Sequence, residues 1–273
     1  MAHLLRHGAS VNTSLLRANP KHNFAHIHAI QIFDSNAIYS MIPKNGCTTM
    51  RVSIALANGA IADASQWEWV HLNNDSFRPS LKELALASYR FTILRCPYAR
   101  LVSCFLDKIV RRTADAAKFQ AVSGISDLDR LTFRRFCAEL AETRVLESNM
   151  HWRPQTGFLV YAQYDDYFCF EDFAAIAPQL KQKIGLTIVD ARPMAKHDSG
   201  QFKLVHATQF FADVELQYIE AMLDSGFFPR PQRFYDQPLR EQIDSIYALD
   251  FDLYNRHFPG KGLLAGQVLD ESV

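Results

Sequence analysis

The amino-acid sequence predicts an α/β domain in which helices flank a central parallel β-sheet, giving three layers. Two successive strand–loop–helix units carry this prediction, the first over residues 37–57 and the second over residues 89–109. A third short strand followed by a helix, over residues 167–184, repeats the pattern. Strands that alternate with helices along a chain pack side by side in one parallel sheet, so the three units are expected to share a sheet.

Two short β-rich runs lie at the start of this pattern, one before the first unit, from His28 to Phe33, and one that opens it, from Ala37 to Ile42. Three turn-forming residues, Asp34-Ser35-Asn36, separate them, which favours a hairpin. A mostly apolar helix is predicted from Thr48 to Ala57, and Asn58-Gly59 is suited to end it. The second run therefore leads through a short loop into the start of a buried helix.

A capping box, Ser80-Leu81-Lys82-Glu83, precedes the second unit and predicts a short helical stretch that ends near Ser88. The strand from Tyr89 to Leu94 follows, and Arg95-Cys96-Pro97 ends it. Proline fits the first turn of a helix, and the next residues place apolar side chains on one broad face. In this helix Arg100 and Lys108 are interpreted as solvated charges.

The rest of the chain is predicted to be mainly helical. Residues 113–129 are polar and small, and we expect a mobile loop there. Further helices are expected near residues 132–142, 173–184, 208–224 and 238–257. Because no repeat or linker interrupts the chain, we expect one domain over residues 1–273, with a flexible N-terminal arm before a core over residues 26–258.

The charge balance excludes a global attraction to nucleic acid or to anionic membranes. Lys and Arg together number 29, as do Asp and Glu, so the formal net charge is zero and anions must bind locally. The cysteines are odd in number and lack CxxC spacing, which favours a reducing compartment. They are Cys47, Cys96, Cys104, Cys137 and Cys169. No uncharged run approaches the ~18–20 residues of a membrane helix, so we expect a cytoplasmic protein.

Histidine spacing does not indicate a metal site. His26 and His28 alternate on one face of the predicted first strand, which is the spacing of a ligand pair. No third ligand at suitable spacing accompanies them. We therefore expect no metal.

The loop of the first unit, Pro43-Lys44-Asn45-Gly46-Cys47-Thr48-Thr49, has the residues that an anion site needs. A tight turn between a strand and a helix exposes backbone N–H groups at the positive end of the helix dipole. Gly46 lets the backbone approach closely, Lys44 adds a charge, and the two threonine hydroxyls can donate hydrogen bonds. The lysine precedes the glycine, which reverses the Walker A order and disfavours ordinary kinases and nucleotide triphosphatases.

This loop resembles the 5′-phosphosulfate loop of sulfotransferases that use 3′-phosphoadenosine 5′-phosphosulfate (PAPS), and Cys47-Thr48 is most similar to the carbohydrate-modifying members. Arg95 at the end of the second strand and Ser103 eight residues later resemble the family's 3′-phosphate site. Arginine offers phosphate a planar bidentate fork, and serine can donate its hydroxyl. The resemblance therefore implies PAPS as the donor, with Lys44 to Thr49, Arg95 and Ser103 binding it.

Three less specific segments extend the resemblance in the same order, Asn149–Gln155, Tyr167–Phe173 and Ile246–Phe251. From about residue 37 to 258 the chain is similar to the broad carbohydrate sulfotransferase family of the heparan 2-O, chondroitin and HNK-1 type. This resemblance implies a P-loop-like fold and a hydroxyl-bearing, carbohydrate acceptor. The chain departs from the family at Cys96, where the family often has an acidic or polar residue, and we expect no membrane anchor like that of Golgi members, which leaves the acceptor open.

Transfer of a sulfuryl group to a hydroxyl needs in-line positioning, a positive charge on the leaving phosphate, and a base. Lys44 is suited to neutralise the leaving phosphate. His71, which lies between the two donor motifs, is the first choice for the base, and His151 in His-Trp-Arg-Pro-Gln is the alternative. A structural role stays open for each histidine.

Other interpretations of the sequence stay open. The tryptophans Trp67, Trp69 and Trp152 could stack on adenine or on a sugar, although core packing is the commoner role of tryptophan. Two alternative functions also remain: a kinase-like phosphotransferase, and a non-catalytic nucleotide-binding protein of the same fold.

Overall fold

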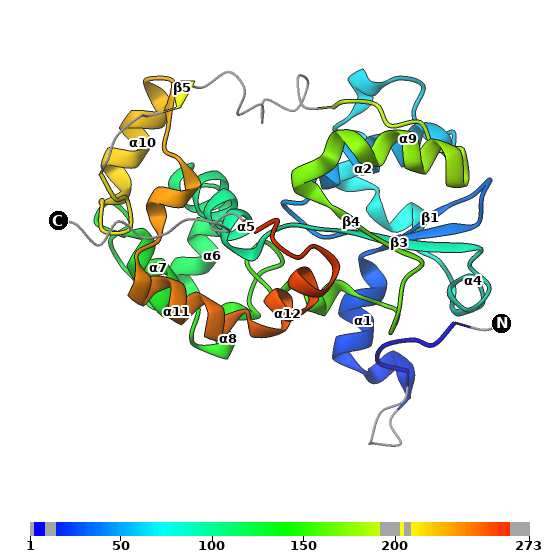
Figure 1. Ribbon diagram of the computed structural model, residues 1–273, viewed down its shortest axis with the longest axis horizontal. Helices are drawn as coiled ribbons and strands as arrows, with labels where there is room; N and C mark the ends of the chain where they lie inside the picture. Colours follow the sequence, from blue (N-terminus) through cyan, green and yellow to red (C-terminus); the bar gives the residue numbers. More distant parts are fainter. Residues whose placement is uncertain (1–2, 9–14, 192–202, 205–208, 263–273) are drawn as a thin grey trace. The chain divides into compact units, whose positions relative to one another are not determined.

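The chain forms two compact units (Figure 1). The computed structural model describes residues 3–8, 15–191, 203–204 and 209–262. Unit 1 comprises residues 1–94 and 155–198, and unit 2 comprises residues 95–154 and 199–273. The chain leaves unit 1 directly after Leu94 and returns to it at Gln155. The single domain expected over residues 1–273 stays a prediction.

A four-stranded sheet with strand order β1-β2-β3-β4 forms the centre of unit 1 (Figure 1). Its strands are β1 (Ala29–Ile32), β2 (Ala37–Ser40), β3 (Tyr89–Leu94) and β4 (Asp166–Cys169). β1 and β2 form the predicted antiparallel hairpin, whereas β2, β3 and β4 are parallel neighbours. The prediction of a central, mostly parallel sheet between helices is confirmed, and its P-loop-like character stays a prediction.

Helices cover both faces of this sheet, with α2 and α9 on one face and α1 on the other (Figure 1). The α-helices of unit 1 are α1 (Pro20–Ile27), α2 (Cys47–Ala57), α3 (Trp69–Leu72), α4 (Leu81–Ala85) and α9 (Phe173–Ile184). Its short 3-10 segments are η1 (Leu16–Ala18), η2 (Ala64–Gln66), η3 (Asn74–Phe77), η5 (Gln155–Phe158) and η6 (Phe170–Asp172).

Local sequence signals set several of these boundaries. The predicted capping box is present at α4, where Ser80 accepts from the Glu83 N–H and the Glu83 side chain accepts from the Ser80 N–H. Helix α9 has the predicted ends, and Gly185 follows it in left-handed backbone with φ 71°. Side chains of β2 and β3 are almost all buried, as expected for parallel strands covered on both faces.

The residues directly before β1 form helix α1 rather than part of the first strand. Asn19 caps α1 by accepting from the N–H groups of Lys21 and His22. The ring of Phe24 packs at 4.9 Å from that of Phe158. His26 therefore lies on a helix and bonds through Nε2 to the Pro79 carbonyl at 2.6 Å, so the predicted strand-face pair with His28 is wrong.

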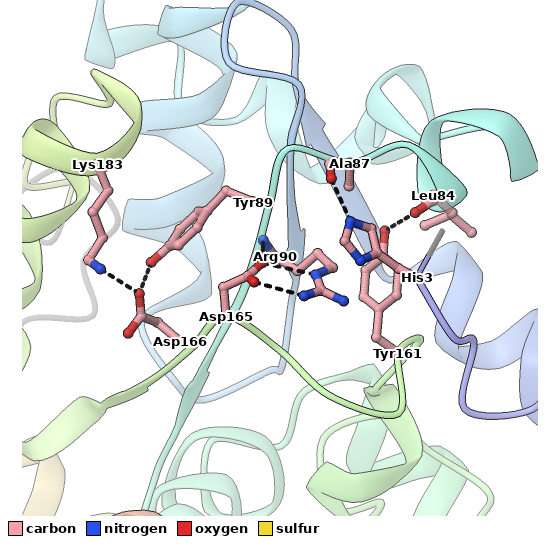
Figure 2. Close-up of polar contacts among 9 residues, drawn as sticks. All are labelled: His3, Leu84, Ala87, Tyr89, Arg90, Tyr161, Asp165, Asp166 and Lys183. Carbon is pink, nitrogen blue, oxygen red and sulfur yellow. Dashed lines mark hydrogen bonds and ion pairs between the residues drawn. The ribbon is translucent and has the colours of Figure 1, made fainter. Parts of the chain in front are cut away.

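One ion pair joins the amino ends of β3 and β4, and a second joins β4 to α9 (Figure 2). Arg90 donates through Nε and Nη2 to the two carboxylate oxygens of Asp165, at 2.9 and 2.7 Å. Asp166 accepts from the Tyr89 hydroxyl and lies 2.9 Å from Nζ of Lys183 on α9. These contacts fix the pairing of β3 with β4 at the edge of the sheet where both strands begin.

Asp165→Asn is expected to lower the free energy of unfolding by about 1 kcal/mol at pH 7, a small value because the Asp165 side chain is 36% exposed. The hydrogen bonds from Arg90 hold the pKa of Asp165 below its ordinary value. This carboxylate therefore stabilises the fold above its unfolded pKa of about 3.9 and loses that effect as the pH falls through its folded pKa. Urea unfolding between pH 7 and pH 3 should show that the difference in unfolding free energy between Asp165→Asn and wild type shrinks as the pH falls. The exposed Asp34→Asn is the control, and a difference that does not change with pH would contradict the assignment.

Unit 2 is almost entirely helical (Figure 1). Its helices are α5 (Pro97–Cys104), the π-helical segment η4 (Phe105–Val110), α6 (Ala114–Ser123), α7 (Phe133–Glu139), α8 (Thr143–Leu146), α10 (Leu216–Asp224), the 3-10 segment η8 (Pro231–Phe234), α11 (Gln237–Ile246) and α12 (Ala248–His257). Strands β5 (Lys203–Leu204) and β6 (Phe227–Phe228) pair in parallel. The core is aromatic, with Phe105, Phe133, Phe136 and Phe234 buried against one another.

The mobile loop predicted over residues 113–129 is wrong, because helix α6 occupies most of it. Thr113 caps the helix by accepting from the Asp115 N–H, and Gly124 ends it in left-handed backbone with φ 82°. Phe119 is fully buried and packs against Phe136 and Trp152. The polar residues are thus the outer face of a helix, and a single phenylalanine anchors its inner face.

Two other predicted helices have different limits. The stretch from Pro238 to His257 is divided at Tyr247, whose hydroxyl donates to the Trp152 carbonyl at 2.6 Å. Helix α10 begins at Leu216, later than predicted, and Thr208 lies outside the described residues. Within the part of the chain that the structure describes, no helix has both the length and the apolar character to cross a membrane.

Candidate functional site

The loop between β2 and α2 passes twice through left-handed backbone, at Lys44 (φ 72°) and at Gly46 (φ 76°). Glycine adopts this conformation readily, whereas another residue pays roughly 1–2 kcal/mol. Strain of this kind is retained where the surrounding structure enforces it, commonly at functional sites. The half-buried Lys44 therefore holds its charge at a conformationally defined point of the loop.

Asn45 fastens the loop to the carboxyl end of β3. Its side chain is fully buried, and Nδ2 donates to the Ile93 carbonyl at 2.8 Å and to Oε1 of Gln155 at 2.7 Å. Asn45 therefore positions the backbone between Lys44 and Gly46. These two hydrogen bonds account for an asparagine at this position without a direct contact to an anion.

Asn45→Ala is expected to lower the free energy of unfolding by about 2–3 kcal/mol, because two buried acceptors lose their donor. The Asn45→Ala, Gln155→Ala double-mutant cycle, measured by chemical unfolding, should give a coupling of about 1 kcal/mol. Additive effects of the two substitutions would contradict a direct bond between these side chains.

Helix α2 begins at Cys47 with Gly46 as its N-cap. The N–H groups of a first turn have no partner within the helix and carry the positive end of its dipole. The residues of this turn, Cys47-Thr48-Thr49-Met50, include no acidic side chain that would neutralise it. Thr48 is half-buried and Thr49 is buried, so their hydroxyls lie at a positive, partly desolvated helix start.

Two phenylalanines lie against the loop from the carboxyl side of β4. A Cβ atom added to Gly46 would lie 2.8 Å from Cε2 of Phe173 and 3.2 Å from Cε2 of Phe170. Both distances are shorter than ordinary carbon contacts. Gly46 is therefore required by its φ and by the space available, which explains the glycine independently of any ligand.

His71 lies on α3 and is exposed, and helix α2 reaches it through Arg51. Nη2 of Arg51 lies 3.0 Å from Nδ1 of His71, and Nη1 donates to the Val70 carbonyl at 3.4 Å. The ring of Trp67 meets that of His71 edge to face at 5.4 Å. The structure thus joins His71 to the helix that starts at the candidate loop.

Arg95 and Ser103 belong to unit 2. Arg95 follows β3 directly and is half-buried, with its Nε atom buried. Ser103 is half-buried on α5, whose first turn contains Pro97 as predicted. Each residue thus has the local setting that the sequence predicts, one just after a strand and the other on the following helix.

His151, also in unit 2, lies in a network with a carboxylate. Its Nε2 atom is 3.4 Å from Oδ2 of Asp115, and its Nδ1 atom is buried. Asp115 also accepts from Nδ2 of Asn149 at 2.7 Å, and Oδ1 of Asn149 accepts from the His151 N–H at 2.9 Å. A carboxylate beside an imidazole favours its protonated form.

The sequence interpretation of Arg100 as a solvated charge is wrong. Arg100 is only 2% exposed and donates to the carbonyls of Arg153 at 2.9 Å and Met150 at 3.4 Å. It therefore holds the turn that carries His151. Lys108 lies 3.1 Å from Asp107 and is half-buried.

Of the three tryptophans, Trp152 packs in the core. It is fully buried, and its indole N–H donates to the Val145 carbonyl at 2.8 Å. Trp67 and Trp69 are half-buried. Stacking of Trp152 on adenine or on a sugar would require its removal from the core.

The candidate residues thus form two sets. Unit 1 contains Lys44 to Thr49 and His71, and unit 2 contains Arg95, Ser103 and His151. Sequence patterns did not single out Arg51, which joins the loop helix to His71. One signal was available: a lone charged residue among the apolar residues of a helix predicted to be buried.

Comparison with known families gives a match over residues 28–258 to the model described as the sulfotransferase family. The match starts just before β1 and ends just after α12, and it includes every candidate residue named above. No curated protein and no solved structure matches the chain.

Proposed function

Because the chain belongs to the sulfotransferase family, we propose that it transfers the sulfuryl group of PAPS to a hydroxyl of a carbohydrate acceptor. The observation that carries the proposal is the loop from Pro43 to Thr49. It presents a lysine in left-handed backbone beside a helix start without acidic residues. A positive, geometrically fixed site of this kind suits the 5′-phosphosulfate of the donor.

Lys44 and the hydroxyls of Thr48 and Thr49 bind the phosphosulfate oxygens, together with the first N–H groups of α2. Gly46 and Cys47 contribute backbone, and Asn45 holds the loop in place through Ile93 and Gln155. Arg95 and Ser103 bind the 3′-phosphate, for which a guanidinium fork and a hydroxyl are suitable donors. The 3′-phosphate distinguishes this donor from AMP and ATP.

The acceptor hydroxyl oxygen attacks the sulfur atom in line with the bond to the 5′-phosphate. A new oxygen–sulfur bond forms while the bond from sulfur to the phosphate oxygen breaks, and 3′-phosphoadenosine 5′-phosphate leaves with the electron pair. Lys44 neutralises the negative charge that grows on the leaving phosphate. The proton of the hydroxyl passes to a histidine base.

Two histidines are candidates for this base. His71 is exposed and belongs to the same unit as the phosphosulfate loop, and it is contacted by Arg51. His151 has the carboxylate of Asp115 as its neighbour. No metal is needed for the proposed reaction. The kinase-like and non-catalytic alternatives find no support in the family match.

Calorimetry with 3′-phosphoadenosine 5′-phosphate, AMP and ATP tests the donor. The first ligand is expected to bind about 10–100-fold more tightly than AMP, because charged hydrogen bonds to its 3′-phosphate are worth about 1.5–3 kcal/mol. Arg95→Ala should remove this preference, whereas Arg130→Ala, an exposed arginine of the same unit, should not. Equal binding of the three ligands to the wild-type protein would overturn the proposal.

The carbohydrate acceptor rests on the similarity of Cys47-Thr48 to the carbohydrate-modifying members. Transfer of labelled sulfate from PAPS to glycans and to small hydroxyl compounds would decide between acceptor classes. Activity with phenols or steroids and none with any glycan would contradict this part of the proposal.

A further inference from the structure

Arg51 is a buried cation with an unusual partner. It is 7% exposed on α2, and among the described residues no carboxylate lies within ion-pair distance of it. Its hydrogen bonds go instead to Nδ1 of His71 at 3.0 Å and to the Val70 carbonyl at 3.4 Å. Burying a charge without a counter-ion is costly, so this arrangement is expected to be kept for a reason other than stability.

The contact decides where His71 carries its proton. A guanidinium has only donor N–H groups and stays protonated at any physiological pH. Nδ1 of His71 must therefore accept with its lone pair, and a neutral imidazole then carries its hydrogen on Nε2. The ring of Trp67 and the hydrogen bond from the His71 N–H to the Glu68 carbonyl at 3.0 Å hold this part of α3 in place.

We propose that Arg51 holds His71 in the tautomer with hydrogen on Nε2, so that His71 acts on the substrates as a hydrogen-bond donor and not as the base. The role of His71 as a hydrogen-bond donor to the substrates rests on the proposed function. A base acting through Nε2 needs a lone pair there and hence hydrogen on Nδ1, where it would face the N–H group of Arg51. Taking up a second proton would place two positive charges side by side at the 3.0 Å contact.

A fixed N–H donor has a clear use in sulfuryl transfer. The sulfuryl group carries negatively charged oxygens while it is transferred, and a preorganised hydrogen-bond donor stabilises such charge without rearrangement. His151 then remains as the candidate base. The groups beside the two histidines have opposite charge, with a guanidinium at His71 and the carboxylate of Asp115 at His151. Only the carboxylate stabilises an imidazole that has taken up a proton.

Nitrogen NMR of the protein without substrates tests the tautomer independently of activity. Long-range proton–nitrogen spectra distinguish the protonated from the unprotonated ring nitrogen, and the His71→Asn variant identifies the His71 signals by their absence. At pH 7 we expect hydrogen on Nε2 alone. Hydrogen on Nδ1, or on both nitrogens, would overturn the proposal whether or not the protein transfers sulfate.

Kinetics then test the role. His71→Gln keeps an N–H donor but cannot take up a proton, so we expect it to retain about a tenth of the wild-type kcat and the wild-type pH profile. Loss of a base would instead cost about 10²–10⁴-fold and remove one limb of that profile. His71→Ala should be clearly slower than His71→Gln, and equal rates for the two variants would contradict the donor role.

Arg51 itself is a positioning residue, and its variants separate positioning from folding. Arg51→Met removes the donor while filling the same space, and Arg51→Lys restores a donor of similar length. We expect kcat to fall about tenfold in the first variant and to recover largely in the second, with KM for PAPS unchanged. Equal kcat losses in both variants would contradict the proposal. If the wild-type protein transfers no sulfate while the Nε2 tautomer is observed, the proposed function fails and the tautomer assignment stands.

Discussion

Lys44→Met is expected to reduce the rate of sulfate transfer by about 10²–10³-fold, the effect typical of losing one preorganised group that stabilises charge in a transition state. Lys44 is half-buried in the loop before α2, and left-handed backbone fixes its position. In the proposed reaction its charge acts where the leaving phosphate becomes more negative, so kcat should fall more than the affinity for the donor. Labelled sulfate transfer at saturating PAPS measures the change.

Two matched variants make this prediction specific. Lys82→Met removes the charge of an exposed lysine in the same unit, on α4, and is expected to leave the rate unchanged. Lys44→Arg retains the charge with a different shape and should restore part of the rate. A wild-type kcat for Lys44→Met would show that the loop takes no part in the chemical step. Equal losses in Lys44→Met and Lys82→Met would point to a general charge effect.

Gly46→Ala is expected to destabilise unit 1 by about 2–5 kcal/mol and to abolish tight donor binding. A left-handed alanine costs roughly 1–2 kcal/mol, and forcing a methyl group into occupied space costs about 1–3 kcal/mol more. The space is occupied because the new Cβ would lie 2.8 Å from Cε2 of Phe173. Relief of this contact would displace the N–H groups that begin α2. Chemical unfolding and donor calorimetry measure the two effects.

Gly59 provides the control for backbone strain. It has φ 73°, nearly that of Gly46, and a Cβ atom added there would meet nothing within 4 Å. Gly59→Ala should therefore show only the conformational cost, and its difference from Gly46→Ala isolates the clash with the phenylalanines. Equal destabilisation at the two positions would show that Phe173 moves aside at no cost.

Local patterns predicted much of the fold. The strand from Tyr89 to Leu94 and the helix from Phe173 to Ile184 have the bounds expected from apolar runs, capping residues and glycine. The hairpin and the start of α2 also follow from turn and helix signals within a few residues. The loop from Pro43 to Thr49 was recognisable for the same reason, since its residues are contiguous.

Errors arose where a distant contact decides the local structure. Helix α6 was missed because only one large apolar side chain, the buried Phe119, anchors a helix made mostly of small and polar residues. The stretch from Pro238 to His257 is two helices, and Tyr247 at the break bonds to the distant Trp152 carbonyl. Arg100 looks like a solvated charge in sequence, yet carbonyls about fifty residues further along the chain satisfy its guanidinium.

The sequence by itself determined the strand–loop–helix units of the sheet and the loop from Pro43 to Thr49, because both depend on neighbours along the chain. Only the tertiary structure decided the surroundings of the two candidate histidines. Arg51 reaches His71 across 20 residues, and Asp115 on helix α6 reaches His151 in a turn after α8. The charge beside an imidazole controls which nitrogen carries a proton, and folding alone brings that charge within hydrogen-bonding distance.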